Sequence, residues 1–495
     1  MFSYKLKYLL LNILLIVSNT IFSQENNIIT LSLSDIVDIY SLHSPAVRME
    51  LLNYENDLLE FANYQKSLLP SISFSFNPVS FNRSLRLLQS PENGSYSYIE
   101  DYSNTSSLGL SVSQKVSLTG GDVNIGTDLS FLNEFSKKRS SFSTTPFYVS
   151  YSQKLWGGKK LFRMEHKIRK AENKATAKKC CSRIAEIQLQ AANLYLEALS
   201  NKLTTDLTLN NMHTNDTILR IGKIKLDNGY ITEYDYKQIE LHSLETEYTY
   251  RQALQKYDEA IQNLRTYLEM DNHTLFSVCT PTLELPDILD VSLIKYWVCQ
   301  NNPSLLEQEQ KKLEAERLLF TAKQETQFNG NISLNYGLNQ YADHFADAYR
   351  HANTQQSFII GFQIPIWQWG INRNKRKIAS NNYAASLFAT EKRMREFDDD
   401  ITEYTKRYNH SLWLWKLSEK AYHLSCEQYR LAVRSFELGE ISVYELTSAR
   451  QKQHDTMQRY YSAIKDTYTS YFRLRSMTLY DFKKNRSLEE MYLKQ

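Results

Sequence analysis

The amino-acid sequence predicts a fold that combines very long α-helices with a small set of amphipathic β-strands, in an order that occurs twice along the chain. The 495 residues contain two long blocks without proline, 147–280 and 366–495, which predict the helices. Outside the long helices, apolar residues recur at every second position, which predicts the strands. An internal repeat predicts that both halves of the chain share one architecture.

The two proline-free blocks have the composition of helices. Glycine occurs only at Gly222 and Gly229 within 159–280 and only at Gly439 within 371–495, whereas Ala, Leu, Glu, Lys, Arg and Gln are plentiful. We therefore predict long helices within 159–270 and 371–476. An uninterrupted helix over 371–437 would be on the order of 100 Å long, far beyond the usual globular helix. Such length indicates a coiled coil or a barrel of helices.

Six segments within 71–156 and 331–367 have the period of β-strands. Their alternating apolar residues are Ile72, Phe74 and Phe76; Leu108, Leu110 and Val112; Val123, Ile125, Leu129 and Phe131; Phe147, Val149 and Tyr151; Ile332, Leu334 and Tyr336; Phe358, Ile360, Phe362 and Ile364. The positions between them are mostly Ser, Gly, Asn and Gln. Alternation of this kind fits both a sheet in water and a sheet in a membrane.

The beginning of the chain favours the membrane. Lys5 and Lys7 precede an apolar run from Leu9 to Val17, and small residues lead to Ser23, which is the pattern of an export signal over 1–23. No later run approaches the roughly 20 apolar residues of a membrane-spanning helix. An exported chain with amphipathic strands fits an outer-membrane β-barrel, in which lipid-facing and lumen-facing side chains alternate.

Three tryptophans, Trp156, Trp367 and Trp369, occur where predicted strands end. Tryptophan is enriched at both interfaces of a membrane, so these residues are candidates for an interfacial aromatic belt. The alternative is that they are core residues at the corners between strands and helices.

Charge and motif content exclude several functions. The formal net charge is +3, and basic and acidic residues are interspersed, so a nucleic-acid partner is not expected. The sequence has no nucleophile elbow and no P-loop, and its ten histidines and five cysteines show no metal-ligand spacing. We therefore expect that the protein is not an enzyme and that it has no cofactor and no metal site.

One half of the chain matches the other. The segment Ser44-Pro45-Ala46-Val47 corresponds to Asn302-Pro303-Ser304-Leu305, and Ile72-Ser73-Phe74 corresponds to Ile332-Ser333-Leu334. We assign the first repeat to 24–280, the second to 281–476, and a C-terminal tail to 477–495. Each repeat has the order helix, strand, strand, helix.

The first repeat is longer than the second between its outer strands. The offset between matching positions is 260 residues at Ile72 and Ile332 but 211 at Leu155 and Ile366, so the first repeat carries 49 additional residues there. Two further strands fit in this insertion, joined by a turn at Thr119-Gly120-Gly121-Asp122. The polar stretches 79–107 and 133–145 are expected to be loops.

The clearest match lies within the helical blocks. The segments are Gly229-Tyr230-Ile231-Thr232-Glu233-Tyr234-Asp235 and Gly439-Glu440-Ile441-Ser442-Val443-Tyr444-Glu445. Glycine just after a helical run ends a helix, and Thr or Ser with an acidic residue three positions later is a capping box that begins the next one. Each segment therefore predicts the turn at the tip of a helical hairpin.

With this duplicated order and these paired tips, nearly all of the mature sequence resembles the outer membrane efflux (TolC) family. The resemblance implies a homotrimer in which three chains share one transmembrane β-barrel in the lipid of the outer membrane and one α-helical barrel of coiled-coil hairpins in the periplasm. It implies a passive conduit for efflux or export, with a periplasmic adaptor (membrane fusion) protein and an inner-membrane transporter as partners.

The resemblance also implies roles for the tip residues. The adaptor would dock at the tip positions Gly229, Ile231, Thr232, Gly439, Ile441 and Ser442. Asp235 and Glu445 would be acidic positions at the periplasmic entrance, where copies of a carboxylate favour cations; plain helix capping is the alternative role. Two polar residues that hold the entrance closed in the family fall on Phe436 and Ile441, which cannot form those links.

Two alternative functions are a periplasmic adaptor and a coiled-coil scaffold of an export system. An adaptor would carry a lipoyl-like β-module instead of a repeat, and a scaffold would show a strict heptad pattern without amphipathic strands. The repeat therefore favours the channel subunit. The sequence leaves open the cargo, the class of pump, the contacts that close the entrance, and whether four strands per chain, as is usual in the family, or six enter the barrel.

Overall fold

The structure is a computed structural model that describes residues 29–89, 94, 96–135, 138–271, 275–282, 284–326 and 328–493. The export signal predicted over 1–23 lies outside the described residues. The chain divides into two compact units. We call one the helical unit (Met1–Leu51, Cys181–Asn301 and Asp400–Gln495) and the other the sheet unit (Leu52–Cys180 and Asn302–Asp399).

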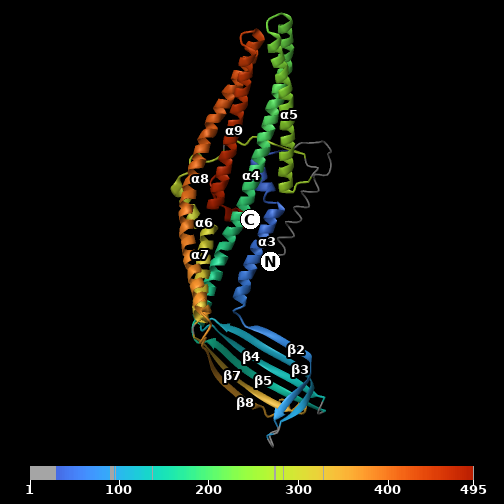
Figure 1. The fold of residues 1–495 in the computed structure, drawn as a ribbon, viewed down its shortest axis with the longest axis vertical. Helices are drawn as coiled ribbons and strands as arrows, with labels where there is room; N and C mark the ends of the chain where they lie inside the picture. Colours follow the sequence, from blue (N-terminus) through green and yellow to red (C-terminus); the bar gives the residue numbers. More distant parts are fainter. Residues whose placement is uncertain are drawn as a thin grey trace. The chain divides into compact units, whose positions relative to one another are not determined.

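The elements follow the predicted order in both halves of the chain (Figure 1). The first half consists of β1 (Ile29–Leu31), α2 (Leu33–Asp35), the π-helix η1 (Ile36–Tyr40), α3 (Pro45–Lys66), β2 (Ser71–Gln89), β3 (Tyr96–Val116), β4 (Gly121–Glu134), β5 (Arg139–Lys154), α4 (Gly158–Asp227), α5 (Glu233–Leu268) and β6 (Phe276–Val278). The second half consists of α6 (Val291–Asn301), α7 (Pro303–Glu325), β7 (Asn329–Ala342), the 3-10 helix η2 (Phe345–Asp347), β8 (Asn353–Gln363), α8 (Ile371–Leu438), α9 (Val443–Thr478), β9 (Tyr480–Asp481), β10 (Arg486–Ser487) and α10 (Leu488–Tyr492).

The long helices have the lengths that the sequence predicts. Helix α4 has 70 residues and α8 has 68, and neither contains an interior proline. Gly222 lies inside α4 where α5 packs closely against it, because a Cβ atom at this position would lie 2.9 Å from Cδ1 of Ile239. In the helical unit, the hairpins α4–α5 and α8–α9 have their turns at the same end (Figure 1).

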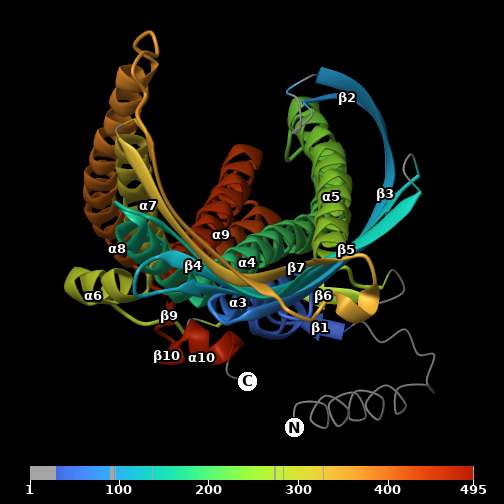
Figure 2. The same ribbon diagram turned by 90° about the horizontal axis from the view of Figure 1, so that it is seen from below.

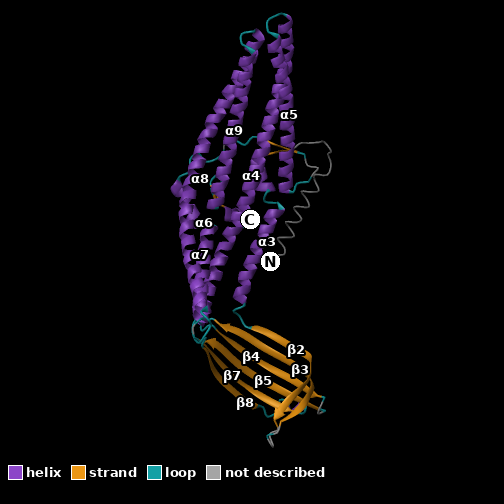
Figure 3. Ribbon diagram, viewed as in Figure 1, coloured by secondary structure: helices purple, strands orange, loops and turns teal. Residues whose placement is uncertain are grey.

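The sheet unit contains one antiparallel sheet with the strand order β2-β3-β4-β5-β7-β8 (Figure 3). Both strands of the insertion, β3 and β4, belong to it, so six strands of the chain share one sheet. Strands β2 and β8 are its two edges. Figure 2 shows that the sheet is strongly curved across its strands.

The prediction of long loops at 79–107 and 133–145 was wrong. Strand β2 continues to Gln89 and β3 begins at Tyr96, while β4 ends at Glu134 and β5 begins at Arg139. Polar residues are compatible with a strand because the ladder of hydrogen bonds uses only the backbone. Tyrosine and threonine, which are common in these segments, also favour extended structure.

The strand register separates an apolar face from a polar face. One row across five strands pairs Ile72 with Val112, Val112 with Ile125, Ile125 with Val149 and Val149 with Tyr336. On the opposite face, a row pairs Ser113 with Asn124, Asn124 with Ser150, Ser150 with Asn335 and Asn335 with Ser357. Most large side chains of the apolar face are exposed in the single chain. This combination is typical of a sheet that meets lipid on one side and water on the other.

Glycines on the polar face make room for larger side chains from neighbouring strands. A Cβ atom at Gly109 would lie 2.3 Å from Oδ1 of Asp128, and one at Gly126 would lie 2.7 Å from the hydroxyl of Tyr148. A Cβ atom at Gly337 would lie 3.0 Å from Cβ of Tyr148. The polar face is therefore closely packed at these positions.

This packing predicts the effect of a larger side chain at Gly109. We expect Gly109→Val to destabilise the sheet by about 2 kcal/mol, because the new methyl groups would overlap the carboxylate of Asp128. The midpoint of thermal unfolding in detergent measures the effect. The double variant Gly109→Val with Asp128→Ala is the control, since it removes the carboxylate that the new side chain would meet; a midpoint no higher than that of Gly109→Val alone would contradict the close packing.

Candidate functional site

The two hairpin turns have the same backbone geometry. Gly229 and Gly439 have φ angles of 76° and 79°, a left-handed conformation that glycine adopts without strain. After α4, the amides of Gly229 and Tyr230 donate to the carbonyls of Leu226 and Lys225. After α8, the amides of Gly439 and Glu440 donate to the carbonyls of Phe436 and Ser435. Both are Schellman motifs.

A capping box begins the helix after each turn, as the sequence predicts. The amide of Asp235 donates to the hydroxyl of Thr232 over 3.1 Å, and the carboxylate of Asp235 accepts from the amide of Thr232, also over 3.1 Å. Ser442 and Glu445 form the same pair over 3.3 and 2.8 Å. Both acidic residues thus cap helices, which was the alternative role considered for them; their role at an entrance stays a prediction.

Hydrogen bonds from Ser442 lower the pKa of Glu445 below its ordinary value. Because the folded pKa is depressed, the contribution of this cap is complete above the ordinary pKa of glutamate and is lost as the pH falls through the lowered value. The cap at the start of α9 is therefore charged and intact at neutral pH.

Ile231 and Ile441 point toward the protein interior rather than outward. Both are half-buried and pack against an apolar cluster that joins the two hairpins. The cluster contains Ile218, Ile239, Tyr429, Phe436, Val443, Leu446 and Ala449. The isoleucines therefore stabilise the turns.

Three tyrosines form the exposed part of the tips. The exposed fractions of Tyr230, Tyr234 and Tyr444 are 79, 77 and 74%. They lie within the two repeated segments, and Tyr234 and Tyr444 occupy equivalent positions. None of the three was predicted as a site residue; Tyr230 corresponds to Glu440, whereas the repetition of Tyr234 and Tyr444 was a signal that could have identified them.

Lys225 connects the two tips. Its ammonium group donates a hydrogen bond to the carbonyl of Phe436 and lies 4.5 Å from the centroid of the Phe436 ring. A cation at the last carbonyls of α8 is favoured by the helix dipole and by the aromatic ring. The side chain of Phe436 cannot form the polar link of the family, but its backbone carbonyl forms one. The contact between Lys225 and Phe436 could not be predicted from local sequence patterns because the two residues are 211 positions apart.

A polar network links the hairpins farther from the tips. The side chains of Asn215 in α4 and Arg450 in α9 each donate to the hydroxyl of Thr246 in α5 over 2.7 Å. Arg450 also lies 3.5 Å from Nδ1 of His242. Three of the four hairpin helices are thus connected by hydrogen bonds in addition to apolar packing.

The C-terminal tail predicted over 477–495 is folded where the structure describes it, up to residue 493. Helix α9 continues to Thr478, and the chain then forms β9, β10 and α10. Leu488 is fully buried against Cys181 and Ala185 of α4. The segment expected as a C-terminal tail therefore packs against an apolar surface on α4.

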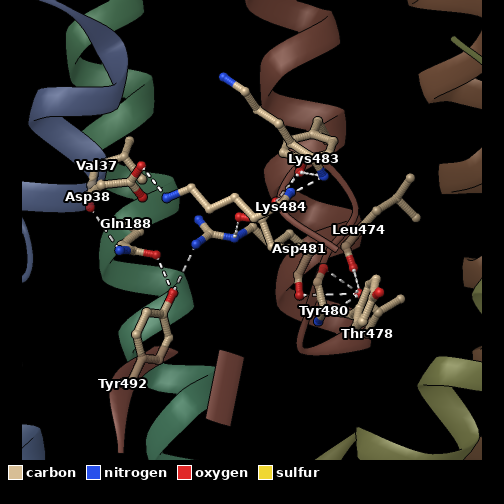
Figure 4. Close-up of polar contacts among 12 residues, drawn as sticks. Val37, Asp38, Gln188, Leu474, Thr478, Tyr480, Asp481, Lys483, Lys484 and Tyr492 are labelled. Atoms are coloured by element: carbon tan, nitrogen blue, oxygen red, sulfur yellow. Dashed lines mark hydrogen bonds and ion pairs between the residues drawn. The ribbon is translucent and has the colours of Figure 1, made fainter. Parts of the chain in front are cut away.

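A buried ion pair holds this C-terminal segment (Figure 4). Nε of Arg475 lies 3.1 Å from Oδ2 of Asp481, and the two side chains are only 2 and 6% exposed. The hydroxyl of Tyr471 and the amides of Lys483 and Lys484 donate to Oδ1 of Asp481 over 2.8, 3.0 and 3.0 Å.

Further hydrogen bonds connect the C-terminal segment to α4 and to η1 near the start of the described chain (Figure 4). The hydroxyl of Tyr492 donates to Oε1 of Gln188 and accepts from Arg475. Gln188 donates to the carbonyl of Val37 over 2.8 Å, and Lys484 pairs with Asp38 over 2.6 Å. A cavity of about 280 Å³ adjoins this region, but its lysines are paired with Asp38 and Glu284, so it has no excess charge to attract an ion.

The three candidate belt tryptophans are exposed in the single chain. The exposed fractions of Trp156, Trp367 and Trp369 are 46, 73 and 84%. Trp156 packs beside Phe328 at a centroid distance of 4.7 Å, and the other two pack against each other at 5.6 Å. They are not core residues of the described chain, and their role in a membrane belt stays a prediction.

The described residues contain no group of three or more His, Cys, Asp or Glu side chains that could hold a metal ion. None of the helices that the structure describes is both long and apolar enough to cross a membrane.

Solved structures show the same fold. The outer membrane channel CmeC of Campylobacter jejuni aligns with a TM-score of 0.65 and 14% identity over 90% of this chain and 85% of that one. A membrane protein of Pseudomonas aeruginosa aligns with a TM-score of 0.64 and 12% identity over 93% of each chain. The outer membrane protein VceC of Vibrio cholerae aligns with a TM-score of 0.60 and 10% identity over 90% of this chain and 95% of that one. The fold is therefore that of outer-membrane channels.

Residues 298–478 match the model of a family described as outer membrane efflux protein. This range contains strands β7 and β8 of the sheet and the whole α8–α9 hairpin with its Gly439 tip. Curated proteins give no match to the sequence. Over this range the chain is similar to outer membrane efflux proteins, and its whole fold is similar to that of outer-membrane channels.

The buried ion pair predicts a strong effect of removing one partner. We expect Arg475→Met to destabilise the helical unit by about 3 kcal/mol, because Asp481 would stay buried without its counter-charge. The midpoint of chemical unfolding in detergent, followed by circular dichroism, measures the loss.

Lys465→Met on the exposed side of the same helix is the control. The double variant Arg475→Met with Asp481→Asn should recover part of the stability, since no unpaired charge remains. A midpoint for Arg475→Met equal to that of Lys465→Met would contradict the role of the ion pair.

Proposed function

We propose that the chain is one subunit of a homotrimeric, passive efflux or export channel that crosses the outer membrane and reaches into the periplasm. The observation that carries the proposal is the curved six-stranded sheet, which has an exposed apolar face, a polar opposite face and two edges that no strand of the described residues covers. Such a sheet is complete only when further copies join it.

The edges support assembly for a physical reason. In the hydrocarbon layer no water can bond the free backbone groups of β2 and β8, and each unpaired group costs several kcal/mol. Pairing β8 of one copy with β2 of the next would satisfy both edges and close a barrel. Three copies is the number that the family resemblance implies.

The paired hairpin tips support docking of a periplasmic adaptor protein. Both turns are fixed by Schellman motifs and capping boxes, so the backbone that carries their exposed side chains has a defined conformation. Tyr230, Tyr234 and Tyr444 offer aromatic surface, which is favoured at protein interfaces because it has apolar area and a hydroxyl group. The adaptor would connect the channel to an inner-membrane transporter.

The acidic residues Asp235 and Glu445 would line the periplasmic entrance in this assembly, and the three tryptophans would lie at the membrane interface. An adaptor or a scaffold function is less well supported, since neither needs a curved sheet with an apolar outer face.

The function is tested by purification from the outer-membrane fraction in mild detergent, light scattering, and conductance in planar lipid bilayers. A trimer that conducts ions supports the proposal. A monomer that stays in solution without detergent would overturn it and would favour the scaffold.

The exposed tyrosines predict where adaptor binding is sensitive to mutation. We expect Tyr230→Ser combined with Tyr444→Ser to lower co-purification of the cognate adaptor at least tenfold, because each substitution removes exposed aromatic surface and keeps the backbone hydrogen bonds of the turn. The trimer and its conductance should be unchanged. Tyr296→Ser in α6, which is also exposed, is the control. Normal adaptor binding by the tip variant would argue against docking at these tyrosines.

A further inference from the structure

We propose that the assembled channel has an eighteen-stranded β-barrel, wider than the usual barrel of its family, with a lumen about 26 Å wide in its membrane part. This inference rests on the proposed trimer. The insertion in the first repeat, which supplies β3 and β4, is responsible for the difference.

The inserted strands are integral to the sheet. Strand β3 pairs with β2 on one side, and its residues 103–116 pair with 121–134 of β4 without a break. Strand β4 pairs in turn with β5. The pair therefore lies between β2 and β5 within the sheet.

The inserted strands also have the same two faces as their neighbours. Leu110 lies beside Phe74 on the apolar face, and Ser111 lies beside Ser73 on the polar face, where their hydroxyls are 2.8 Å apart. A hairpin that folded over the mouth of a barrel as a loop would have no lipid-facing side. The continuous apolar face indicates that β3 and β4 cross the membrane with the other strands.

The turn between the inserted strands lies where the other strands meet the helices. A Cβ atom at Gly120 would lie 2.7 Å from the backbone of Gly158, the first residue of α4. Tyr151 near the end of β5 donates to the hydroxyl of Thr119 over 2.9 Å. The inserted pair thus spans the full height of the sheet.

Strand number sets the width of a closed barrel. With a strand spacing of about 4.8 Å and a tilt of about 40°, eighteen strands give a backbone radius of about 18 Å and twelve strands about 12 Å. If side chains occupy about 5 Å, half the spacing of packed sheets, the lumen is about 26 Å wide instead of about 14 Å. A single helix of about 10–12 Å would fill the narrower lumen, whereas two would pass through the wider one.

The register allows the insertion to be removed cleanly. Asn82 pairs with Ser103, Ser103 with Glu134 and Glu134 with Arg139, so these residues lie at one level. Replacing residues 83–138 by Asn-Gly would join Asn82 to Arg139 through a two-residue hairpin turn and leave four strands. Replacing only 83–102 by Asn-Gly is the matched control, since it has the same junction at Asn82 but keeps all six strands.

Electron cryomicroscopy of the purified assemblies in detergent counts the strands in cross-section. We expect eighteen strands in the native protein and in the control, and twelve in the four-strand variant with a barrel about one third narrower. If the four-strand variant does not assemble, the number of strands in the native protein and in the control still decides whether the barrel has eighteen strands.

Trimers of the native protein with twelve strands, and with β3 and β4 outside the barrel, would overturn this inference and leave the proposed channel intact. Native protein that is monomeric or absent from the outer membrane would instead overturn the proposed function, and the inference with it.

Discussion

The pairing of backbone hydrogen-bonding groups is the constraint on which the rest of this structure depends. Inside the sheet the backbone groups of the six strands pair with one another, but β2 and β8 each have one edge whose backbone groups are unpaired in the sheet. An apolar face that is exposed along the same strands needs lipid, and in lipid the free edges need partners. In the proposed channel, a membrane meets the first requirement and further copies of the chain meet the second.

Duplication gives the two hairpin tips the same local structure but different contacts. Both turns have a glycine with positive φ, a Schellman motif and a capping box, because these depend only on residues within seven positions of one another. The contacts between the tips are not duplicated. Lys225 reaches the last turn of α8, whereas Ser435, its equivalent in the second repeat, bonds to Glu440 in its own turn. The first repeat therefore donates the hydrogen bond between the tips, and the second repeat accepts it.

The sequence predicted those features that arise from local patterns. The helix expected over 371–437 is α8, and all six strands were located from alternating residues such as Phe358 and Ile360. The strand ends in 79–107 and 133–145 were missed because polar residues do not distinguish a loop from a strand whose side chains are solvated. The folded C-terminal segment and the contacts of Lys225 were missed because their partners are distant in sequence. Arg475 gave no signal either, since a buried arginine has the same sequence pattern as an exposed one.

The polar face of the sheet explains why a conduit of this kind would select little by itself. Its central row consists of hydroxyl and amide side chains, from Ser113 and Asn124 to Asn335 and Ser357. These groups bond to water as readily as to a solute, so a passing molecule gains little by binding them. Lys115 and Asp122, which are register partners on this face, carry opposite charges. In the proposed channel, a lumen lined mostly by such groups would discriminate mainly by size, so the choice of cargo would rest with the partners that load the channel.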